Sequence, residues 1–141
     1  MEYKRFEDTY VVRLDRGEEL IETLKEFVKK EKITLGSISG LGASNCVEVG
    51  LFNIETKEYK KNVYEQDMEI TSVIGNISTM DDEPYLHIHI NLSDENNNVI
   101  GGHLSKCIIS ATCELFIQKV EGRVDRTKSE EIGINLYDFN K

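Results

Sequence analysis

The three histidines of this chain are the residues whose type and spacing point most directly to chemistry. They are His87, His89 and His103, so all three lie within seventeen residues of one another. His87 and His89 are separated by one residue in a segment where apolar and polar side chains alternate, which places both on the same face of a predicted strand. Imidazole is a common metal ligand, and three histidines that leave a fourth position open are typical of catalytic zinc sites. The pattern therefore predicts a divalent metal site, with zinc as the first choice among the ions that imidazole binds.

The turn that follows decides whether His103 reaches the other two histidines. Residues 94–98 read Asp-Glu-Asn-Asn-Asn, which predicts a polar hairpin turn centred on Asn96. Paired positions then sum to 192, so His89 lies directly opposite His103, with Cβ atoms about 4.5–5.5 Å apart. A one-residue bulge would instead turn His103 to the other face of the sheet. On spacing alone, two solvated histidines without a ligand are the alternative interpretation.

Other residues could assist the histidines or act without them. Glu114 lies inside the apolar segment 107–120 and is a possible accessory carboxylate if it is buried, whereas an outward-facing side chain is the alternative. Cys107 and Cys113 share one face of that predicted strand, and we expect small buried side chains there rather than ligands. The chain contains neither a Gly-x-Ser-x-Gly elbow nor a P-loop, so serine-based catalysis and this mode of nucleotide binding have no support.

Most of the elements that position these residues are predicted to be strands. Apolar, alternating or β-branched segments predict strands at 10–14, 34–39, 46–52, 57–64, 69–80, 85–93, 107–120 and 134–139. Two close glycines within Ser39–Ala43 predict a tight turn or a close backbone approach, and Gly75-Asn76 predicts a bulge. An apolar face at helical spacing predicts the one long helix over 18–31, with Asp15 and Glu18 as a capping box. The predicted fold class is α+β: one compact domain with a mainly antiparallel sheet and one long helix near the N-terminus.

Composition and charge narrow the class of protein. A chain of 141 residues, 39% hydrophobic and 30% charged, is typical of one globular domain. The 17 basic and 26 acidic residues give a net charge of −9, which opposes approach to nucleic acids and to anionic membranes. No apolar segment approaches the ~20 residues that span a bilayer, and the N-terminus has no signal-peptide pattern. Three cysteines do not make a disulfide framework, so we expect a reducing, cytoplasmic location. The charge and the absence of a long apolar segment lead us to expect no membrane binding.

Five short segments follow one another in a characteristic order. They are Ser39–Ala43, Ile74–Ile77, Leu86–Ile90, Gly101–Leu104 and Ala111–Leu115. This ordered set resembles the plants-and-prokaryotes-conserved (PPC) domain family, and the resemblance extends over about residues 5–138. It implies a compact α+β domain that assembles as a homotrimer. It also implies that the three histidines occupy the family's histidine positions, where a divalent metal has been associated with prokaryotic members.

Plant members of this family carry two features that bear on function. One is an Arg-Gly-Arg-Pro segment that enters the minor groove of DNA, and this sequence contains no such segment. The other is a Gly-Arg-Phe-Glu-Ile-Leu segment that recruits transcription factors. Residues 66–71 read Gln-Asp-Met-Glu-Ile-Thr here, so Asp67 stands where the plant proteins have arginine.

The sequence therefore predicts a stand-alone, homotrimeric PPC-like domain over residues 1–141 that binds metal through its histidines. The family label implies a regulatory or DNA-associated role, acting through a protein partner or a small ligand. Direct nucleic-acid binding is expected to be weak or absent, because the basic residues near the C-terminus are interleaved with acidic ones. The basic residues are Lys119, Arg123, Arg126 and Lys128. The alternatives are a small-molecule-binding protein or metal-dependent enzyme with its site at the trimer interface, and a structural assembly module.

Overall fold

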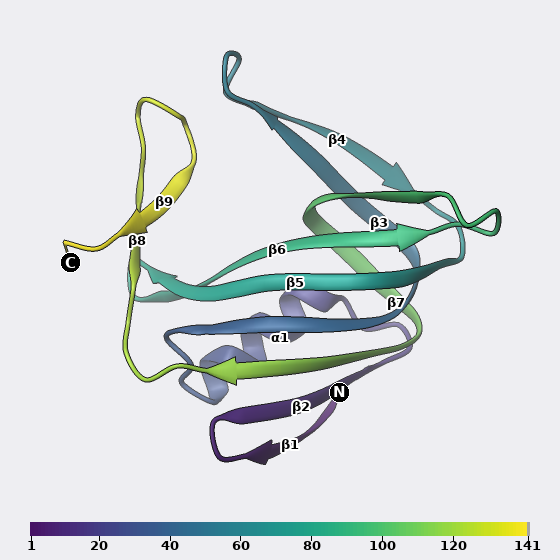
Figure 1. Cartoon of the computed structure of the whole chain (residues 1–141), viewed down its shortest axis with the longest axis horizontal. Helices are drawn as coiled ribbons and strands as arrows, with labels where there is room; N and C mark the ends of the chain where they lie inside the picture. Colours follow the sequence, from purple (N-terminus) through teal and green to yellow (C-terminus); the bar gives the residue numbers. More distant parts are fainter. Residues whose placement is uncertain (141) are drawn as a thin grey trace.

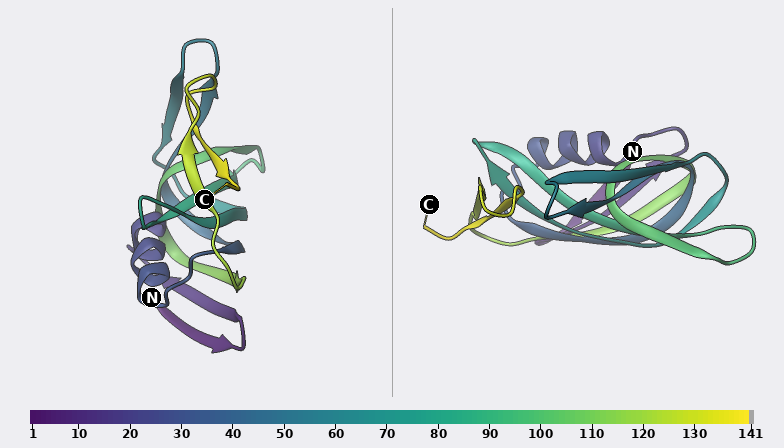
Figure 2. Two further views of the ribbon diagram at one scale, coloured as in Figure 1. Left: turned by 90° about the vertical axis from the view of Figure 1, so that its left-hand side faces the viewer. Right: turned by 90° about the horizontal axis from the view of Figure 1, so that it is seen from above.

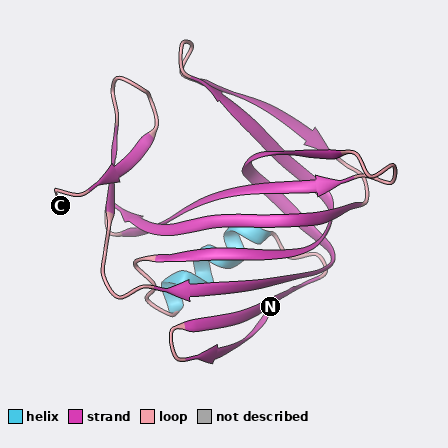
Figure 3. Cartoon of the chain, in the orientation of Figure 1, coloured by secondary structure: helices cyan, strands magenta, loops and turns pink. Residues whose placement is uncertain are grey.

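The structure, a computed structural model, describes residues 1–140, which form nine strands and one helix (Figures 1 and 3). The strands are β1 (Glu2–Phe6), β2 (Thr9–Asp15), β3 (Gly36–Asn53), β4 (Glu58–Tyr64), β5 (Met68–Met80), β6 (Glu83–Ser93), β7 (Val99–Lys119), β8 (Asp125–Lys128) and β9 (Asn135–Asp138). The helix, α1, covers Leu20–Lys30. The predicted mainly antiparallel sheet is confirmed. No helix within residues 1–140 has the length and apolar character that crossing a bilayer requires.

Part of the sheet closes into a ring of strands, and the rest extends from that ring as an open sheet. Strand β7 lies between β2 and β3, and β1 forms the edge beyond β2. Strand β6 pairs with both β5 and β7, so β3, β5, β6 and β7 form a closed ring of strands. The β3–β4 hairpin and the β8–β9 hairpin extend away from this body (Figures 1 and 2). Within residues 1–140, every pairing between strands is antiparallel except the single contact of β5 with β8.

Helix α1 covers one face of the sheet and leaves the other face open, as the right-hand view of Figure 2 shows. Its apolar side buries Leu20, Leu24, Phe27 and Val28. The ring of Phe27 packs edge-on against Tyr10 of β2 at 5.3 Å between centroids. Burying side chains of this size contributes about 1.5–3 kcal/mol each. The face opposite α1, called the helix-free face below, is the face that bears the histidines.

The helix is shorter than predicted, at 11 residues. Glu18 reaches back as predicted and accepts the backbone N–H of Asp15 at 2.7 Å, but Asp15 is the last residue of β2 and does not cap the helix. The N-cap is Glu19, whose carboxylate accepts the N–H of Glu22 at 2.7 Å. At the other end, Lys32 takes a φ of +52°, in the left-handed region that terminates helices. The predicted long helix is therefore corrected to a short one.

Glycines allow strands to continue where the sequence predicted breaks. Strand β3 runs through Gly40 and Gly42 with shifts in register rather than ending there. A Cβ at either position would collide with backbone of β7, which confirms the predicted close backbone approach. Gly75 is regularly paired, and the bulge in β5 lies between Ile70 and Ser72 instead. Gly75 serves packing, because a Cβ there would lie 2.8 Å from the Ile88 side chain.

Candidate metal centre

The β6–β7 hairpin has the predicted register. His89 pairs with His103 and Ser93 pairs with Val99, so paired positions sum to 192 as expected. The turn is fixed by Asp94, whose carboxylate accepts the backbone N–H groups of Asn96 and Asn98 at 2.9 Å each. These hydrogen bonds, that of Asn98 first, lower the pKa of Asp94. The charged turn therefore holds two histidines opposite each other.

The three imidazoles converge on one point of the helix-free face. One ring nitrogen from each of His87, His89 and His103 lies within 4.8 Å of the other two. The Nε2 atoms of His87 and His89 are 3.3 Å apart. Zinc–nitrogen bonds of about 2.0–2.1 Å at tetrahedral angles require ligand nitrogens about 3.3–3.4 Å apart. The spacing of His87 and His89 therefore fits two ligands of one tetrahedral ion, and a ring nitrogen of His103 lies within 4.8 Å of both.

The histidines lie at the border between the sheet and solvent. His89 is exposed, whereas His87 and His103 are half-buried. Burial, assisted by the neighbouring histidines, lowers the pKa of His103 to about 4. Burial also lowers the pKa of His87, and the charge of Arg126 adds to this shift. Both imidazoles are thus neutral at pH 7, which is the form that binds metal.

A cavity of about 340 Å³ opens beside the histidines. Its other walls come from the β3–β4 hairpin and from the loop between β8 and β9, and they are Gly50, Leu51, Phe52, Ile54, Tyr59, Ile132 and Ile134. Lys57 connects the two hairpins, because its ammonium donates to the carbonyl of Glu130 and its side chain packs against Gly133. The ring of Tyr59 lies 5.1 Å from that of His103, between centroids. No motif in the sequence pointed to Tyr59, Ile132 or Ile134.

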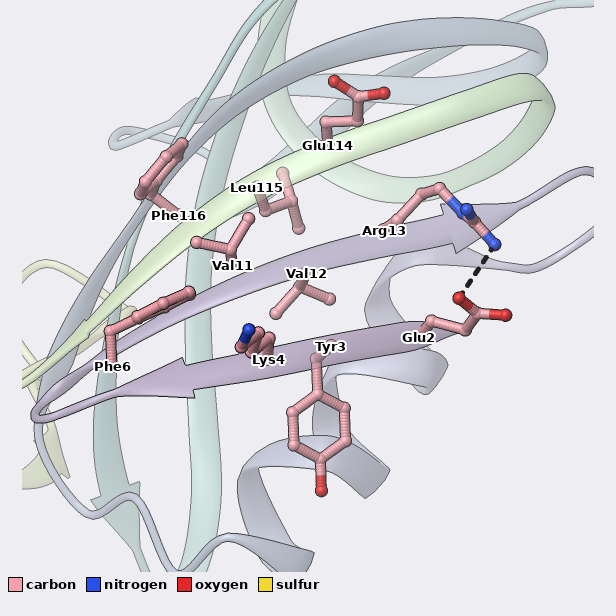
Figure 4. A pocket seen from close by; sticks show the side chains of 10 residues that line it. All are labelled: Glu2, Tyr3, Lys4, Phe6, Val11, Val12, Arg13, Glu114, Leu115 and Phe116. Atoms are coloured by element: carbon pink, nitrogen blue, oxygen red, sulfur yellow. Dashed lines mark ion pairs between the residues drawn. The ribbon is translucent and has the colours of Figure 1, made fainter.

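Glu114 does not join the histidines. It lies eleven residues beyond His103 on β7, and strands advance about 3.3 Å per residue. Its side chain is exposed on the helix-free face, where its cross-strand neighbours are Arg13 and Leu41. Figure 4 shows it at one end of a separate groove that also holds Phe116. The predicted accessory role at the metal centre therefore has no geometric basis.

The cysteines lie where the sequence placed them. Cys107 and Cys113 are fully buried, and both are free thiols. Burial raises the pKa of Cys107 to about 11 and that of Cys113 to about 12. Neither is part of the histidine cluster. The expectation of small buried side chains rather than ligands is confirmed.

Arg126 differs from the other basic residues near the C-terminus, among which the sequence places it, because its side chain is buried. The side chain is only 5% exposed. Its guanidinium is stacked between the rings of Tyr85 and Tyr137, at 4.6 and 4.3 Å from their centroids. It donates hydrogen bonds to Ser78 Oγ, Asn76 Oδ1 and the carbonyl of Asn135 at 2.8–2.9 Å. Arg126 therefore attaches the C-terminal hairpin to the sheet.

Comparison with known proteins agrees with this geometry. The model of the Plants and Prokaryotes Conserved (PCC) domain matches residues 1–121. A candidate DNA-binding protein from Bacteroides thetaiotaomicron superposes with a TM-score of 0.97 at 33% identity, covering 99% of this chain and 98% of its own. A comparison with curated proteins gave no match.

Two archaeal structures are also similar. The plant- and prokaryote-conserved protein of Pyrococcus horikoshii is 36% identical with a TM-score of 0.88, covering 97% of this chain and 93% of its own. A metal-containing protein from Archaeoglobus fulgidus is 32% identical with a TM-score of 0.87, covering 96% of each chain. These similarities extend over nearly the whole chain and include the strands that bear the histidines. The chain therefore belongs to the Plants and Prokaryotes Conserved domain family.

Proposed function

We propose that His87, His89 and His103 hold one divalent transition-metal ion, with zinc as the first candidate. The observation that carries this proposal is the convergence of three ring nitrogens within 4.8 Å, two of them at 3.3 Å. Three neutral imidazoles leave a tetrahedral ion one further position for water or a ligand. The metal-containing relative from Archaeoglobus fulgidus supports the same interpretation. When bound, such an ion supplies a Lewis acid and lowers the pKa of a coordinated water.

Metal analysis of the purified protein tests this proposal. Wild-type protein should retain close to one ion per chain, and His87→Ala/His89→Ala should retain none after dialysis against a weak chelator. Asn91→Ala is a matched control, because Asn91 is an exposed polar residue on the same strand that offers no imidazole. Stoichiometric metal in the double variant would refute the proposal.

The proposal extends to a homotrimer formed through the helix-free face. Cross-strand partners place Val11, Phe116, Ser39, Ile74 and His89 in one row across this face. Phe116 is 58% exposed and Ile74 is 65% exposed, which are large fractions for apolar side chains. Figure 4 shows Phe116 beside Val11, with Phe6 nearby on β1. A neighbouring copy seated on this row would reach the metal centre, which agrees with the alternative of a ligand or enzyme site at the trimer interface.

A regulatory role would act through a protein partner or a small ligand rather than through direct DNA contact. The net charge is −9, and two of the four basic residues near the C-terminus are already engaged. Arg126 is buried, and Arg123 is paired with Asp82 and Asp125 at 2.8 and 2.7 Å. The Bacteroides relative is a candidate DNA-binding protein, so DNA association through such a partner agrees with the family label. Three free cysteines, two of them buried, favour a reducing cytoplasmic location.

A further inference from the structure

We propose that the cavity beside the histidines takes a small organic anion with a branched apolar body, bound with its carboxylate at the metal. This inference rests on the metal site proposed above and names the class of ligand that the site accepts. The walls of the cavity and the charge around it carry the argument, each independently of the other.

The walls are almost entirely apolar. Leu51, Phe52 and Ile54 come from the β3–β4 hairpin, and Ile132 and Ile134 come from the C-terminal loop. Apart from the three histidines, the hydroxyl of Tyr59 is the one polar side-chain group among the lining residues of the described chain. Such walls select an aliphatic body through the hydrophobic effect and offer sugars or polyols little hydrogen bonding. A volume of about 340 Å³ suits a small molecule and excludes a folded partner.

The residues that line the cavity offer a bound metal ion no negative charge. No aspartate or glutamate lines the cavity in the described residues, so three neutral imidazoles leave a divalent ion with its full charge. A divalent charge against apolar walls is less well solvated than in water, and an anionic ligand compensates for this. The protein thus leaves the negative charge to be supplied by the ligand.

Arg126 strengthens this preference from the same face of the sheet, since its partners Asn76 and Tyr85 share that face with His87 and His89. Within residues 1–140, its hydrogen-bond partners are a hydroxyl, an amide and a backbone carbonyl, all of them neutral. One of them, Asn76, pairs with His87 in the β5–β6 register and lines a second hollow with His87 and His89. The guanidinium therefore adds positive potential close to the histidines while its own hydrogen bonds hold it away from the ligand. Arg126 is an electrostatic and positioning residue, not a contact residue.

The test uses zinc-loaded full-length protein and three probes followed by NMR titration. The probes are 3-methylbutanoate, its isosteric amide 3-methylbutanamide, and acetate. We expect 3-methylbutanoate to bind at least tenfold more tightly than the amide, which lacks the charge, and than acetate, which lacks the apolar body. Removal of zinc with a chelator should weaken the binding of 3-methylbutanoate at least tenfold.

Matched variants locate the binding. Ile134→Ser should lower the affinity for 3-methylbutanoate at least fivefold while zinc is retained. Leu136→Ser, on the same hairpin but outside the cavity, should leave this affinity unchanged. A second pair lies on the β3–β4 hairpin, in case the Ile134 variant does not fold. There Leu51→Ser alters the cavity and Val63→Ser is the control outside it. Equal affinities for carboxylate and amide, or unchanged binding in both cavity variants, would overturn the inference while leaving the metal site standing. Failure of the wild-type protein to bind zinc or any other divalent transition metal would overturn the proposed function, and this inference with it.

Discussion

His89 and His103 face each other across the β6–β7 hairpin in the register that the turn at Asp94 sets. Because side chains alternate along a strand, a slip of one residue in this turn would move His103 to the opposite face of the sheet. The chemistry of the centre thus depends on a polar turn that contributes no ligand to it. The carboxylate of Asp94 holds the turn by accepting two backbone N–H groups.

Asp94→Ala should lower the melting temperature at pH 7 and weaken metal binding, with a pH dependence that identifies the cause. Hydrogen bonds from the turn lower the pKa of Asp94 in the folded state, so its stabilising contribution is complete above the unfolded value of about 3.9. That contribution is lost as the pH falls through the lower folded value. Calorimetry of the metal-free wild type and variant should show a difference in melting temperature at pH 7 that becomes smaller towards pH 2. A difference of the same size at both pH values would show that the charge of Asp94 is not responsible.

The histidine centre could be predicted because its determinants are local. The alternation of residues 85–93 and the five polar residues of the turn are enough to set the register, and the structure has that register. Cys107 and Cys113 were likewise placed by period-two spacing on one strand. Local patterns of this kind depend only on the geometry of neighbouring residues.

The cavity walls and Arg126 could not be predicted, because they depend on contacts between distant segments. Ile132 and Ile134 reach the histidines only because the C-terminal hairpin is attached to the sheet, and nothing in their own segment signals this. In the sequence, Arg126 resembles any exposed arginine, yet in the structure it is enclosed by Tyr85 and Tyr137. Glu114 has the outward-facing side chain that the sequence left open as the alternative, although its neighbours in the sequence are apolar.

Arg126→Leu should detach the C-terminal hairpin. The substitution leaves the hydroxyl of Ser78 and the amide oxygen of Asn76 without their donor, and it removes two stacking contacts. Each partner left unsatisfied in a buried place costs about 1–3 kcal/mol. Hydrogen exchange should accelerate over residues 125–138, and the free energy of unfolding should fall by about 2–4 kcal/mol. Arg126→Lys should not restore protection, because an ammonium cannot stack as a planar guanidinium does.

Lys128→Leu is the matched control for this experiment, since Lys128 is an exposed cation on the same strand as Arg126. It should change the free energy of unfolding by no more than about 0.5 kcal/mol. Unchanged exchange over residues 125–138 in Arg126→Leu would show that other contacts hold the hairpin.

Phe116→Asp should break the proposed trimer. A carboxylate in the middle of an apolar contact between copies would be desolvated without a partner, at a cost of several kcal/mol. Light scattering of the wild-type protein should give close to three times the chain mass of 16.1 kDa, and the variant should approach one chain mass. Val99→Asp is the control, because Val99 is similarly exposed, at 61%, but lies at the turn of the β6–β7 hairpin. A monomeric wild-type protein at micromolar concentration would refute the trimer, and an intact trimer in Phe116→Asp would place its contact on another face.

The protein should bind duplex DNA weakly or not at all. Each phosphate contact requires a cation that is free to approach the backbone, and each such contact makes affinity fall as salt rises. Near the C-terminus, Arg126 is buried and Arg123 already pairs with two carboxylates, which leaves Lys119 and Lys128 among acidic neighbours. A titration at about 50 mM salt, where non-specific electrostatic binding is strong, should give a dissociation constant weaker than about 10 µM. The combined variant Glu121→Lys/Glu130→Lys/Glu131→Lys reverses the local charge and should bind measurably, which shows that the assay detects a basic patch on this fold. Submicromolar binding by the wild-type protein that weakens steeply with salt would mean that a local patch overrides the net charge of −9, and DNA contact would then be direct.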